Sequence, residues 1–469
     1  MTRRIPITGC EGDNLNPLDY VHVNRSKWLD ELKEFLSIPS VSTQAEHKPD
    51  IERAARWLRD QLQAVGFPKV EVMPTAGHPI VYAEWLAAGP SAPTLLIYGH
   101  YDVQPPDPLD LWHTPPFEPT IVGDDLFCRG ASDDKGQLYT HVKAIEAFKE
   151  TLGAPPVNVK CLFEGEEEVG SVNLNPFIVA HKDLLAADVA VISDSHILGK
   201  DIPAIVYALR GIAYVEVEVT GPTGDLHSGI YGGAVHNPIN ALCAMIASLH
   251  DEHNRVAIPG FYDAVRDLDA GERAALAKIP FNREAWLKEA GVSADWGDPD
   301  YTIVERTSAR PTLDVNGIWG GYIEPGAKTV LPSKAFAKIS MRLVPDQKHA
   351  EIARLIEEHL KAVAPPTVSV AVRNLHGGEG AIVNRDSAAI RAAFQAYEAG
   401  FGVTPVFMRE GGSIPVVAAF KEELGIDTVL MGFGLPDDNL HAPNEKMHLP
   451  NVYKGIETVI HFMTTLGAG

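Results

Sequence analysis

Cysteine is scarce in this chain, with four residues among 469, and no two of them form a C-x-x-C pair. Such scattered cysteines fit neither a disulfide framework nor a thiolate zinc site, and they are typical of a reducing compartment. No run of about 18 apolar residues occurs, so the sequence predicts no transmembrane helix. The first residues contain no apolar stretch long enough for a signal peptide, and we therefore expect a cytoplasmic protein.

Positive charge is also in deficit, since 40 Lys and Arg stand against 62 Asp and Glu, for a formal net charge of −22. This balance argues against nucleic acid as a partner, because phosphates require a basic surface, and equally against an anionic membrane. With 45% hydrophobic and 22% charged residues, the composition is that of an ordinary globular protein. The length favours two or more domains.

The chain also lacks a G-x-S-x-G segment and a cysteine in a suitable histidine context, which argues against a nucleophilic serine or cysteine hydrolase. What it has is a dense group of acids. The segment FEGEEEVGS, residues 163–171, places four glutamates within five positions at the end of an apolar run. Acidic runs are usually solvated turns. A bound cation is the alternative, because it would neutralise charges that otherwise repel each other.

Helix and strand patterns alternate in the first part of the chain. Apolar residues recur at helical spacing over 51–65, and 136–153 has the pattern of another helix. The segments 94–102 and 186–194 are short apolar runs typical of buried strands. This alternation predicts a largely parallel sheet whose faces are covered by helices.

The pattern changes after residue 210. Segments 213–221 and 335–344 alternate apolar and polar residues, and 367–374 partly does so, which is typical of an antiparallel sheet with one solvated face. Helical stretches at 238–250 and 348–363 could cover the other face, and a helical insertion occupies about 260–305. We predict an α/β domain over 1–210 and 379–469, interrupted by a smaller α+β domain over 211–378.

Acids and histidines stand where several predicted strands end. These residues are His100 and Asp102, Asp133 and Asp134, the glutamates of 163–171, Asp194 and, late in the chain, His441. Ligand sites in open α/β sheets lie beyond the carboxyl ends of the strands. A structural histidine or a solvated acid would explain any one of these positions. Their combination predicts a carboxylate-rich metal site.

Two histidines and three carboxylates can hold two divalent ions if one carboxylate bridges them. Two-metal sites of this kind hold the ions about 3.5–4 Å apart and activate a water between them. Asp102, two residues beyond His100, is placed to engage the second nitrogen of that imidazole. Adjacent Glu167 and Glu168 can point in different directions, so that one binds metal and the other accepts a proton.

Seven motifs of a known family occur in order: YGHYDVQP, RGASDDKG, EGEEEVGS, DLHSG, AKTVLP, REGGSIP and HAPNE. Over essentially its whole length the sequence resembles the binuclear-zinc metallopeptidase family of carnosinases, aminoacylases and carboxypeptidase G. It is most similar to the cytosolic non-specific dipeptidase, or carnosinase-like, branch. The resemblance implies a zinc-peptidase domain with a mixed, largely parallel sheet, interrupted by a lid and dimerisation domain with an antiparallel sheet.

The resemblance also implies a role for each acid and histidine. The implied metal ligands are His100 and Asp194 for one ion, Glu168 and His441 for the other, and Asp133 as the bridge, joined by a cis peptide to Asp134. Glu167 is implied to be the general base, and Asp102 to orient His100. Glu164 is then a structural acid, and Ser132 stands where the branch usually has threonine, a change expected to be neutral.

Substrate recognition follows from the same motifs. His227 is implied to donate a hydrogen bond to the tetrahedral oxyanion. Without the resemblance it would be read as a loop histidine. Arg342 is implied to bind the C-terminal carboxylate of a peptide, since a guanidinium fork suits that group, and the alternative is an exposed strand residue. Thr329, Gly412 and Ser413 could add hydrogen bonds to the same carboxylate.

The sequence therefore predicts a metal-dependent dipeptidase. It would hydrolyse dipeptides or short peptides with a free C-terminal carboxylate, through a water between two divalent ions and with Glu167 as general base. Zn²⁺ is favoured, and Mn²⁺ and Co²⁺ suit the same ligands. An N-acyl amino acid amidohydrolase is the alternative, and a non-catalytic binding protein of the same fold is more remote. We expect a homodimer in which His227 completes the site of the neighbouring subunit.

Overall fold

The computed structural model describes residues 15–412 and 414–468. The chain forms two compact units. The first comprises Met1–Ile205, Asn384–Val406 and Ala419–Gly469, and the second comprises Val206–Val383 and Phe407–Ala418. The sequence patterns placed the two domain junctions at 210/211 and 378/379, and they gave no sign that 407–418 belongs with the second unit.

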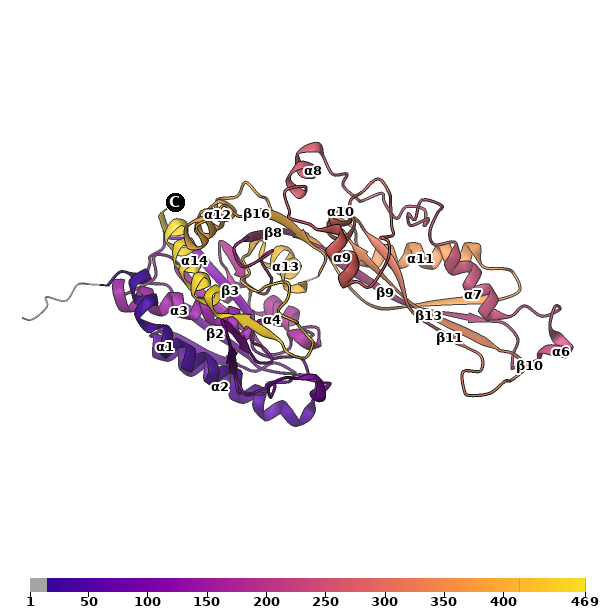
Figure 1. Cartoon of the computed structure of the whole chain (residues 1–469), viewed down its shortest axis with the longest axis horizontal. Helices are drawn as coiled ribbons and strands as arrows, with labels where there is room; N and C mark the ends of the chain where they lie inside the picture. The colour runs from indigo at the N-terminus through magenta and orange to yellow at the C-terminus, as the bar shows by residue number, and fades with distance from the viewer. Residues whose placement is uncertain (1–14, 413, 469) are drawn as a thin grey trace, which may run out of the picture. The chain divides into compact units, whose positions relative to one another are not determined.

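Within the described residues, nine strands form one mixed sheet (Figure 1). Its order is β1-β2-β6-β3-β7-β17-β8-β15, and β16 pairs with β8. β3 is parallel to β6 and β7, and β17 is parallel to β7, whereas β1, β2 and β15 join by antiparallel pairing. The strands are β1 Lys69–Met73, β2 Ile80–Trp85, β3 Thr94–His100, β6 Asn158–Glu164, β7 Val189–Ile192, β8 Ala204–Leu209, β15 Ala381–Ile382, β16 Val406–Glu410 and β17 Asp427–Leu430.

The strands at the centre of this sheet are buried on both faces. Every residue of β6 and β7 is buried, as is all of β3 after its first residue. Such strands read as continuous apolar runs, which is how the sequence showed them. A second, smaller antiparallel sheet of the first unit has the order β18-β5-β4, with β4 Thr120–Val122, β5 Asp125–Phe127 and β18 Lys446–His448.

Long helices cover the sheet of the first unit. α3 (Lys135–Leu152) packs on β3 and against α1 (Pro17–Leu36) and α14 (Leu449–Ala468), and α14 packs against α12 (Ala388–Phe401). α2 (Lys48–Val65) lies on β1 and β2 and ends at Gly66, whose φ of 104° suits glycine. The shorter helices of this part are η1 Ala45–His47, η2 Leu109–Leu111, η3 Glu167–Val169, α4 Leu174–Ala180, α5 Lys182–Leu185 and η4 Phe420–Leu424, and α13 spans Pro415–Ala419.

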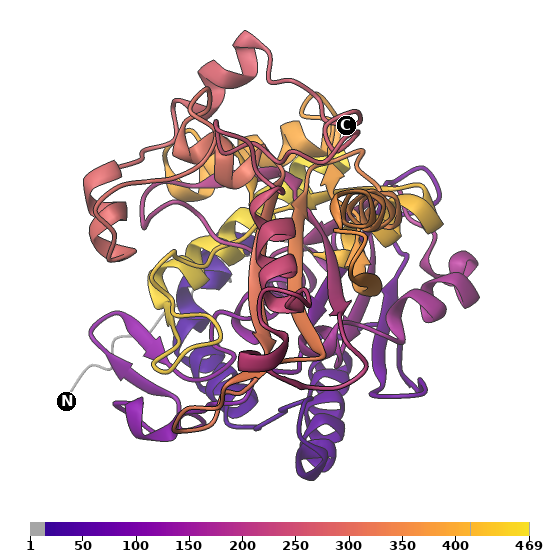
Figure 2. The same ribbon diagram turned by 90° about the vertical axis from the view of Figure 1, so that its right-hand side faces the viewer.

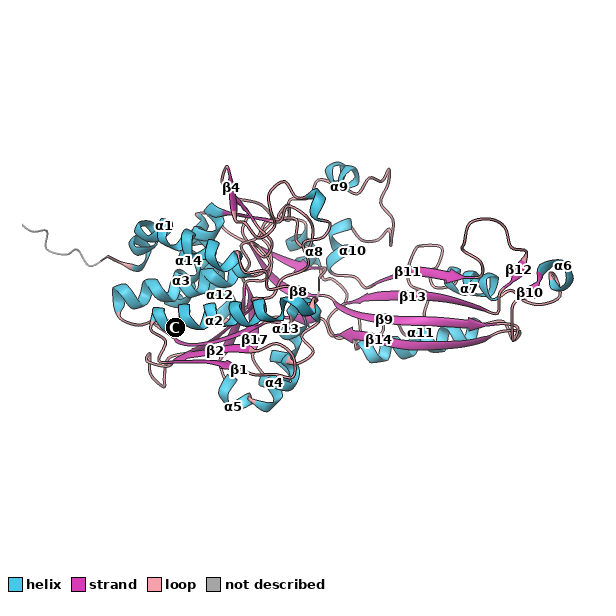
Figure 3. Cartoon of the chain, turned by 90° about the horizontal axis from the view of Figure 1, so that it is seen from below, coloured by secondary structure: helices cyan, strands magenta, loops and turns pink. Residues whose placement is uncertain are grey.

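The second unit contains a four-stranded antiparallel sheet with the order β11-β13-β9-β14. α7 (Pro238–Ala247) and α11 (His349–Val363) pack on the same face of this sheet (Figure 2). The strands β11, β13, β9 and β14 run side by side (Figure 3). Alternate residues of β9 and β13 are buried under these helices, where they form one apolar core. The strands are β9 Gly211–Thr220, β11 Thr312–Gly320, β13 Lys334–Leu343 and β14 Ser369–Gly378.

Short elements complete the second unit. They are β10 Leu226–His227 paired with β12 Val330–Leu331, α6 Ser228–Tyr231, α8 Ala270–Leu276, α9 Arg283–Glu289 and α10 Ile303–Ser308. Arg409 shows why 407–418 joins this unit. Its Nε donates to Glu272 of α8 at 2.8 Å, and the hydroxyl of Tyr207 donates to the same carboxylate at 2.6 Å. These partly buried hydrogen bonds join residues that lie far apart in the sequence.

The predicted fold class is confirmed. The structure has a mixed, helix-covered sheet with a parallel centre and a separate antiparallel sheet in the interrupting region. Within residues 15–412 and 414–468, every helix is too short or too polar to cross a membrane.

Candidate metal centre

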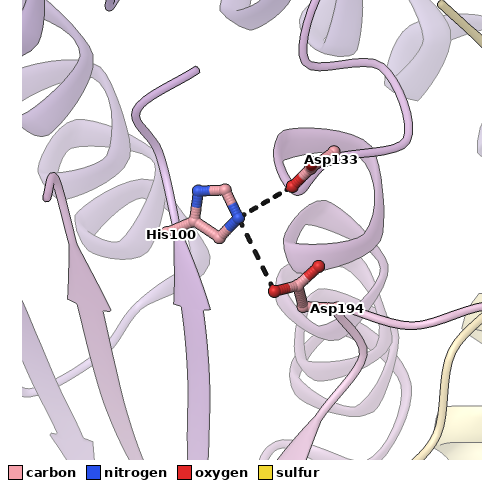
Figure 4. Close-up of side chains that lie close together, drawn as sticks. All are labelled: His100, Asp133 and Asp194. Carbon is pink, nitrogen blue, oxygen red and sulfur yellow. Dashed lines mark hydrogen bonds and ion pairs between the residues drawn. The ribbon is translucent and has the colours of Figure 1, made fainter. Parts of the chain in front are cut away.

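Three side chains from separate elements meet beyond the carboxyl ends of the parallel strands (Figure 4). His100 is the last residue of β3, Asp133 lies just before α3, and Asp194 follows β7. The Nε2 atom of His100 lies 3.0 Å from Oδ1 of Asp133 and 3.8 Å from Oδ2 of Asp194. Because β3 and β7 are adjacent and parallel, their last residues lie at the same edge of the sheet. These three residues form the first candidate metal group.

A second group forms on the other side of Asp133. The Nε2 atom of His441 lies 2.9 Å from Oδ2 of Asp133 and 3.3 Å from Oε2 of Glu168. The two oxygens of Asp133 therefore face two different histidines, which is the arrangement that a bridging carboxylate requires. Within each group the candidate ligand atoms lie within 4.8 Å of one another. The five residues expected as ligands thus gather into two groups that share Asp133.

The loop before α3 is held by close backbone packing. The peptide bond between Asp133 and Asp134 is cis, as the resemblance implied. Oδ2 of Asp134 accepts a hydrogen bond from the backbone N–H of His100 at 3.1 Å, so this second aspartate supports the end of β3. Gly136 admits no side chain, because a Cβ there would lie 2.0 Å from the carbonyl oxygen of Ala131.

Asp102 contacts His100, Glu167 and Glu168. Nδ1 of His100 lies 3.1 Å from the backbone carbonyl of Asp102 and 3.5 Å from its carboxylate Oδ1. The two carboxylate oxygens accept hydrogen bonds from the backbone N–H groups of Glu167 and Glu168, at 3.2 and 3.1 Å. The sequence led us to expect that the Asp102 carboxylate orients His100. Its shorter carboxylate contacts are those to the two glutamate amides.

The electrostatics of the protein groups favour a bound cation. Burial and the nearby Asp133 raise the pKa of Glu168 to about 9, and burial raises the pKa of Glu167 to about 7. Burial would also raise the pKa of Asp133, but hydrogen bonds with His100 and His441 outweigh it and lower that pKa. Several carboxylates thus lie close together, with few positive charges near them, in a buried space of low dielectric constant. Imidazole nitrogens and carboxylate oxygens at this spacing fit divalent ions, which would stabilise the ionised forms.

The other two glutamates of the acidic segment have different partners. Glu164 accepts hydrogen bonds from the hydroxyls of Tyr98 and Ser171. Glu166 accepts one from the backbone N–H of His78 at 2.7 Å and another from Asn173 at 2.8 Å. Both side chains thus support neighbouring segments.

Four of the residues expected to bind substrate lie in the second unit: His227, Thr329, Arg342 and Gly412. The fifth, Ser413, is outside the described residues. His227 is exposed at the end of β10, and its Nδ1 accepts a hydrogen bond from the backbone N–H of Gly229 at 3.0 Å. The neutral ring consequently carries its proton on Nε2. The carbonyl of Thr329 accepts from the N–H of Ser228 at 3.1 Å, so Thr329 adjoins His227.

Arg342 and Gly412 complete that expected set. Arg342 lies on β13, opposite Ile212 of β9, and is partly buried. Gly412 is exposed, whereas a Cβ at the preceding Gly411 would lie 2.6 Å from the carbonyl oxygen of Thr307. Glycine at 411 thereby permits a close backbone approach.

Sequence reasoning missed three buried polar residues beside the metal groups. Gln137 accepts hydrogen bonds from the N–H groups of Phe433 and Gly434 and donates to the carbonyl of Ser132. Arg129 and Glu445 form a buried ion pair at 2.8 Å. All three stand in or next to the motifs RGASDDKG and HAPNE. Apart from Ser132, the partners named here lie far away in the sequence, so the motifs give the only local signal.

Comparison with known proteins gives consistent matches over nearly the full length. The family model described as peptidase family M20/M25/M40 matches residues 96–465. The Cys-Gly metallodipeptidase dug1 of Schizosaccharomyces pombe is 37% identical over 470 residues, covering 96% of this chain and 98% of that protein. The Beta-Ala-His dipeptidase of Homo sapiens is 32% identical, covering 94% and 90%. An M20 family metallo-carboxypeptidase from Sulfolobus solfataricus has a similar structure, with a TM-score of 0.83, 34% identity, and coverage of 94% and 100%.

Proposed function

This chain belongs to peptidase family M20/M25/M40 and is a hydrolase, and we propose that it cleaves dipeptides and short peptides with a free C-terminal carboxylate. The observation that carries this proposal is the position of Asp133. Its two oxygens face two separate groups of histidine and carboxylate ligands, beside the partly buried Glu167. The names of the relatives, a Cys-Gly metallodipeptidase and a Beta-Ala-His dipeptidase, support a dipeptide substrate.

We propose two divalent ions at these groups. Zn²⁺ is the first choice, and Mn²⁺ and Co²⁺ suit the same mixed donors. His100, Asp133 and Asp194 would hold one ion, and Asp133, Glu168 and His441 the other. When bound, the ions would polarise the scissile carbonyl and make a water more acidic.

Glu167 is the proposed general base. It adjoins the ligand Glu168 in η3, and Asp102 holds the backbone amides of both residues. Its carboxylate would accept a proton from the attacking water and pass it to the leaving amine. A single acid-base group of this kind accounts for about 10²–10⁴ in rate.

His227 and Arg342 are proposed to bind the substrate. Because Nδ1 of His227 accepts from Gly229, its Nε2–H is the available donor, as stabilisation of an oxyanion requires. Arg342 would pair with the C-terminal carboxylate through its guanidinium fork. Thr329, Gly412 and Ser413 are proposed to contribute hydrogen bonds to that carboxylate.

We propose that the protein is a cytoplasmic homodimer in which the second unit supplies the contacts between subunits. β11 is an edge strand of the antiparallel sheet, and it exposes Ile318 and Trp319, while Ile323 beyond its end is 80% exposed. Exposed apolar groups of this kind are typical of surfaces that associate. The free thiols of Cys128, Cys161 and Cys243 support a reducing compartment.

A substrate panel tests this function. The panel contains Cys-Gly, β-Ala-His, a C-terminally amidated dipeptide, a tripeptide, and N-acetyl and N-succinyl amino acids, each assayed with added Zn²⁺, Mn²⁺ or Co²⁺. We expect the free dipeptides to have the highest kcat/KM and the amidated dipeptide to react poorly, because it lacks the carboxylate. Faster turnover of the N-acyl amino acids would instead assign the chain to the amidohydrolases.

A further inference from the structure

Glu445 occupies an unusual position for a carboxylate. Its side chain is fully buried, four residues beyond His441 in the segment HAPNE. Oε1 accepts hydrogen bonds from the backbone N–H groups of Ser132 and Asp133, at 3.0 and 3.1 Å. Oε2 accepts from the N–H of Gly130 at 2.9 Å and from Nη1 of Arg129 at 2.8 Å. One buried side chain thus fixes the loop that carries the shared ligand of both metal groups.

Arg129 extends this contact to the loop of His441. Only 1% of its surface is exposed, and its Nη2 donates to the carbonyl of Ala442 at 3.2 Å and to that of Pro105 at 3.2 Å. Ala442 follows His441 directly. A continuous chain of hydrogen bonds therefore runs from the amide of Asp133 through Glu445 and Arg129 to the residue next to His441.

The loop of His441 requires such support. His441 has a φ of 59°, and the neighbouring Asn439 and Asn444 have φ values of 56° and 66°. Residues other than glycine enter this left-handed region at an energetic cost, and they remain there only when surrounding contacts fix them. The side chain of His441 is also 58% exposed, so packing contributes little to its position. By contrast, His100 is fully buried at the end of a central strand.

We propose that Glu445 and Arg129 form a positioning clamp that sets the distance between Asp133 and His441. The clamp thereby determines the affinity of the group Asp133, Glu168 and His441 for its ion. The group containing His100 and Asp194 depends on it less, because the sheet strands β3 and β7 place those two ligands. This inference rests on the metal binding proposed above.

The clamp uses both carboxylate oxygens of Glu445 as hydrogen-bond acceptors. Glu445→Gln keeps the shape, but its NH₂ group must face two N–H donors, whichever way the amide is turned. One pair of hydrogen bonds is then lost, either to Ser132 and Asp133 or to Gly130 and Arg129. Arg129→Lys is the second variant, because a single ammonium group cannot reproduce the fork that reaches Glu445, Ala442 and Pro105.

The test is a metal-binding isotherm for each ion on the full chain, measured with Zn²⁺ and Co²⁺ over buffered free-metal concentrations. Loss of a residue that supports metal ligands typically costs about 10–100-fold in affinity. We expect Glu445→Gln and Arg129→Lys to weaken one ion by about that factor and the other ion by clearly less. In a His441→Ala background, Glu445→Gln should then have only the smaller effect on the ion that remains.

Glu146→Gln is the matched control. Glu146 is a buried carboxylate on α3 that accepts from Lys27, Trp28 and Lys143, about three turns away from Asp133. This variant should lower Tm and leave both affinities unchanged. Equal weakening of both ions in Glu445→Gln, or no weakening, would overturn the clamp while the wild type still binds two ions. A wild type that binds no ion would overturn the proposed function as well.

Discussion

Asp102 and Glu168 are joined by a hydrogen bond of 3.1 Å from the backbone N–H of Glu168 to the carboxylate of Asp102. The second carboxylate oxygen accepts the N–H of Glu167, and the carbonyl of Asp102 lies 3.1 Å from Nδ1 of His100. One aspartate therefore fixes a ligand of the first group, a ligand of the second group and the proposed base relative to one another.

Asp102→Asn should weaken metal binding and lower kcat. The amide NH₂ of asparagine cannot accept the N–H of Glu167 or Glu168, so one of these hydrogen bonds is replaced by a repulsive contact. We expect a loss of about 10–100-fold in metal affinity, as for other residues that hold ligands. Asp125→Asn is the control, because Asp125 pairs with His448 in the small sheet, outside both metal groups. Wild-type affinity in Asp102→Asn would contradict this role.

Asp133→Ala should remove both ions, because each of its oxygens belongs to a different group. Asp194→Ala should remove one ion and retain the other, since Asp194 belongs to the first group alone. Elemental analysis of the two purified variants after dialysis distinguishes these outcomes. If Asp133→Ala kept two ions per chain, Asp133 would not be the bridge.

Glu167→Gln should abolish most activity while both ions stay bound. Glutamine preserves the shape of the side chain but cannot take up a proton, so we expect kcat to fall by about 10²–10⁴. Metal content and steady-state kinetics are measured on the same preparation. Glu166→Gln is the comparison, because Glu166 accepts from His78 and Asn173, and we expect it to retain turnover. Near-normal turnover in Glu167→Gln would move the role of base to another glutamate of the segment.

The sequence was most informative where local pattern determines position. His100 and Asp194 end adjacent parallel strands, so their meeting follows from the sheet alone. The alternation in 213–221 and 335–344 likewise predicted β9 and β13, because one face of that sheet is covered and the other is solvated.

Long-range polar contacts were not predictable in this way. Glu445 satisfies four donors that lie more than 300 residues earlier in the chain, and Arg409 pairs with Glu272 across another long separation. A hydrogen bond between distant segments leaves no periodic signal. Such a bond depends on the final positions of both backbones. The contacts of Glu445, and the packing of 407–418 with the second unit, therefore appeared only in the structure.

His141 should make stability depend on pH. It is buried on α3, with Nε2 2.7 Å from the hydroxyl of Ser193, and burial lowers its pKa from 6.5 to about 3. Above about pH 6.5 the ring is neutral in both states, so its contribution is fully present. As the pH falls from about 6.5 toward 3, the unfolded chain binds a proton that the folded chain does not. Stability should fall by up to about 1.4 kcal/mol per pH unit in this window.

His141→Gln removes this proton uptake. Urea unfolding of wild type and variant in the presence of a chelator, at about pH 7.5 and about pH 5, measures the difference in unfolding free energy. We expect the wild type to lose more stability than the variant on acidification. Equal losses in both proteins would show that His141 is not the responsible group.

His227 should act on the site of the neighbouring subunit. It lies in the second unit, whereas all five proposed ligands and Glu167 lie in the first. His227→Ala and Glu167→Gln should each be nearly inactive as homodimers. When the two variants are mixed under conditions that exchange subunits, each mixed dimer would combine Glu167 from one chain with His227 from the other in one intact site. For random exchange at equal concentrations we expect about a quarter of wild-type activity, since half of the dimers are mixed and each has one of two sites intact.

Glu166→Gln mixed with Glu167→Gln controls for dilution effects, and exchange is verified independently with two differently labelled chains. If exchange occurs and activity does not return, His227 acts within its own chain or outside catalysis.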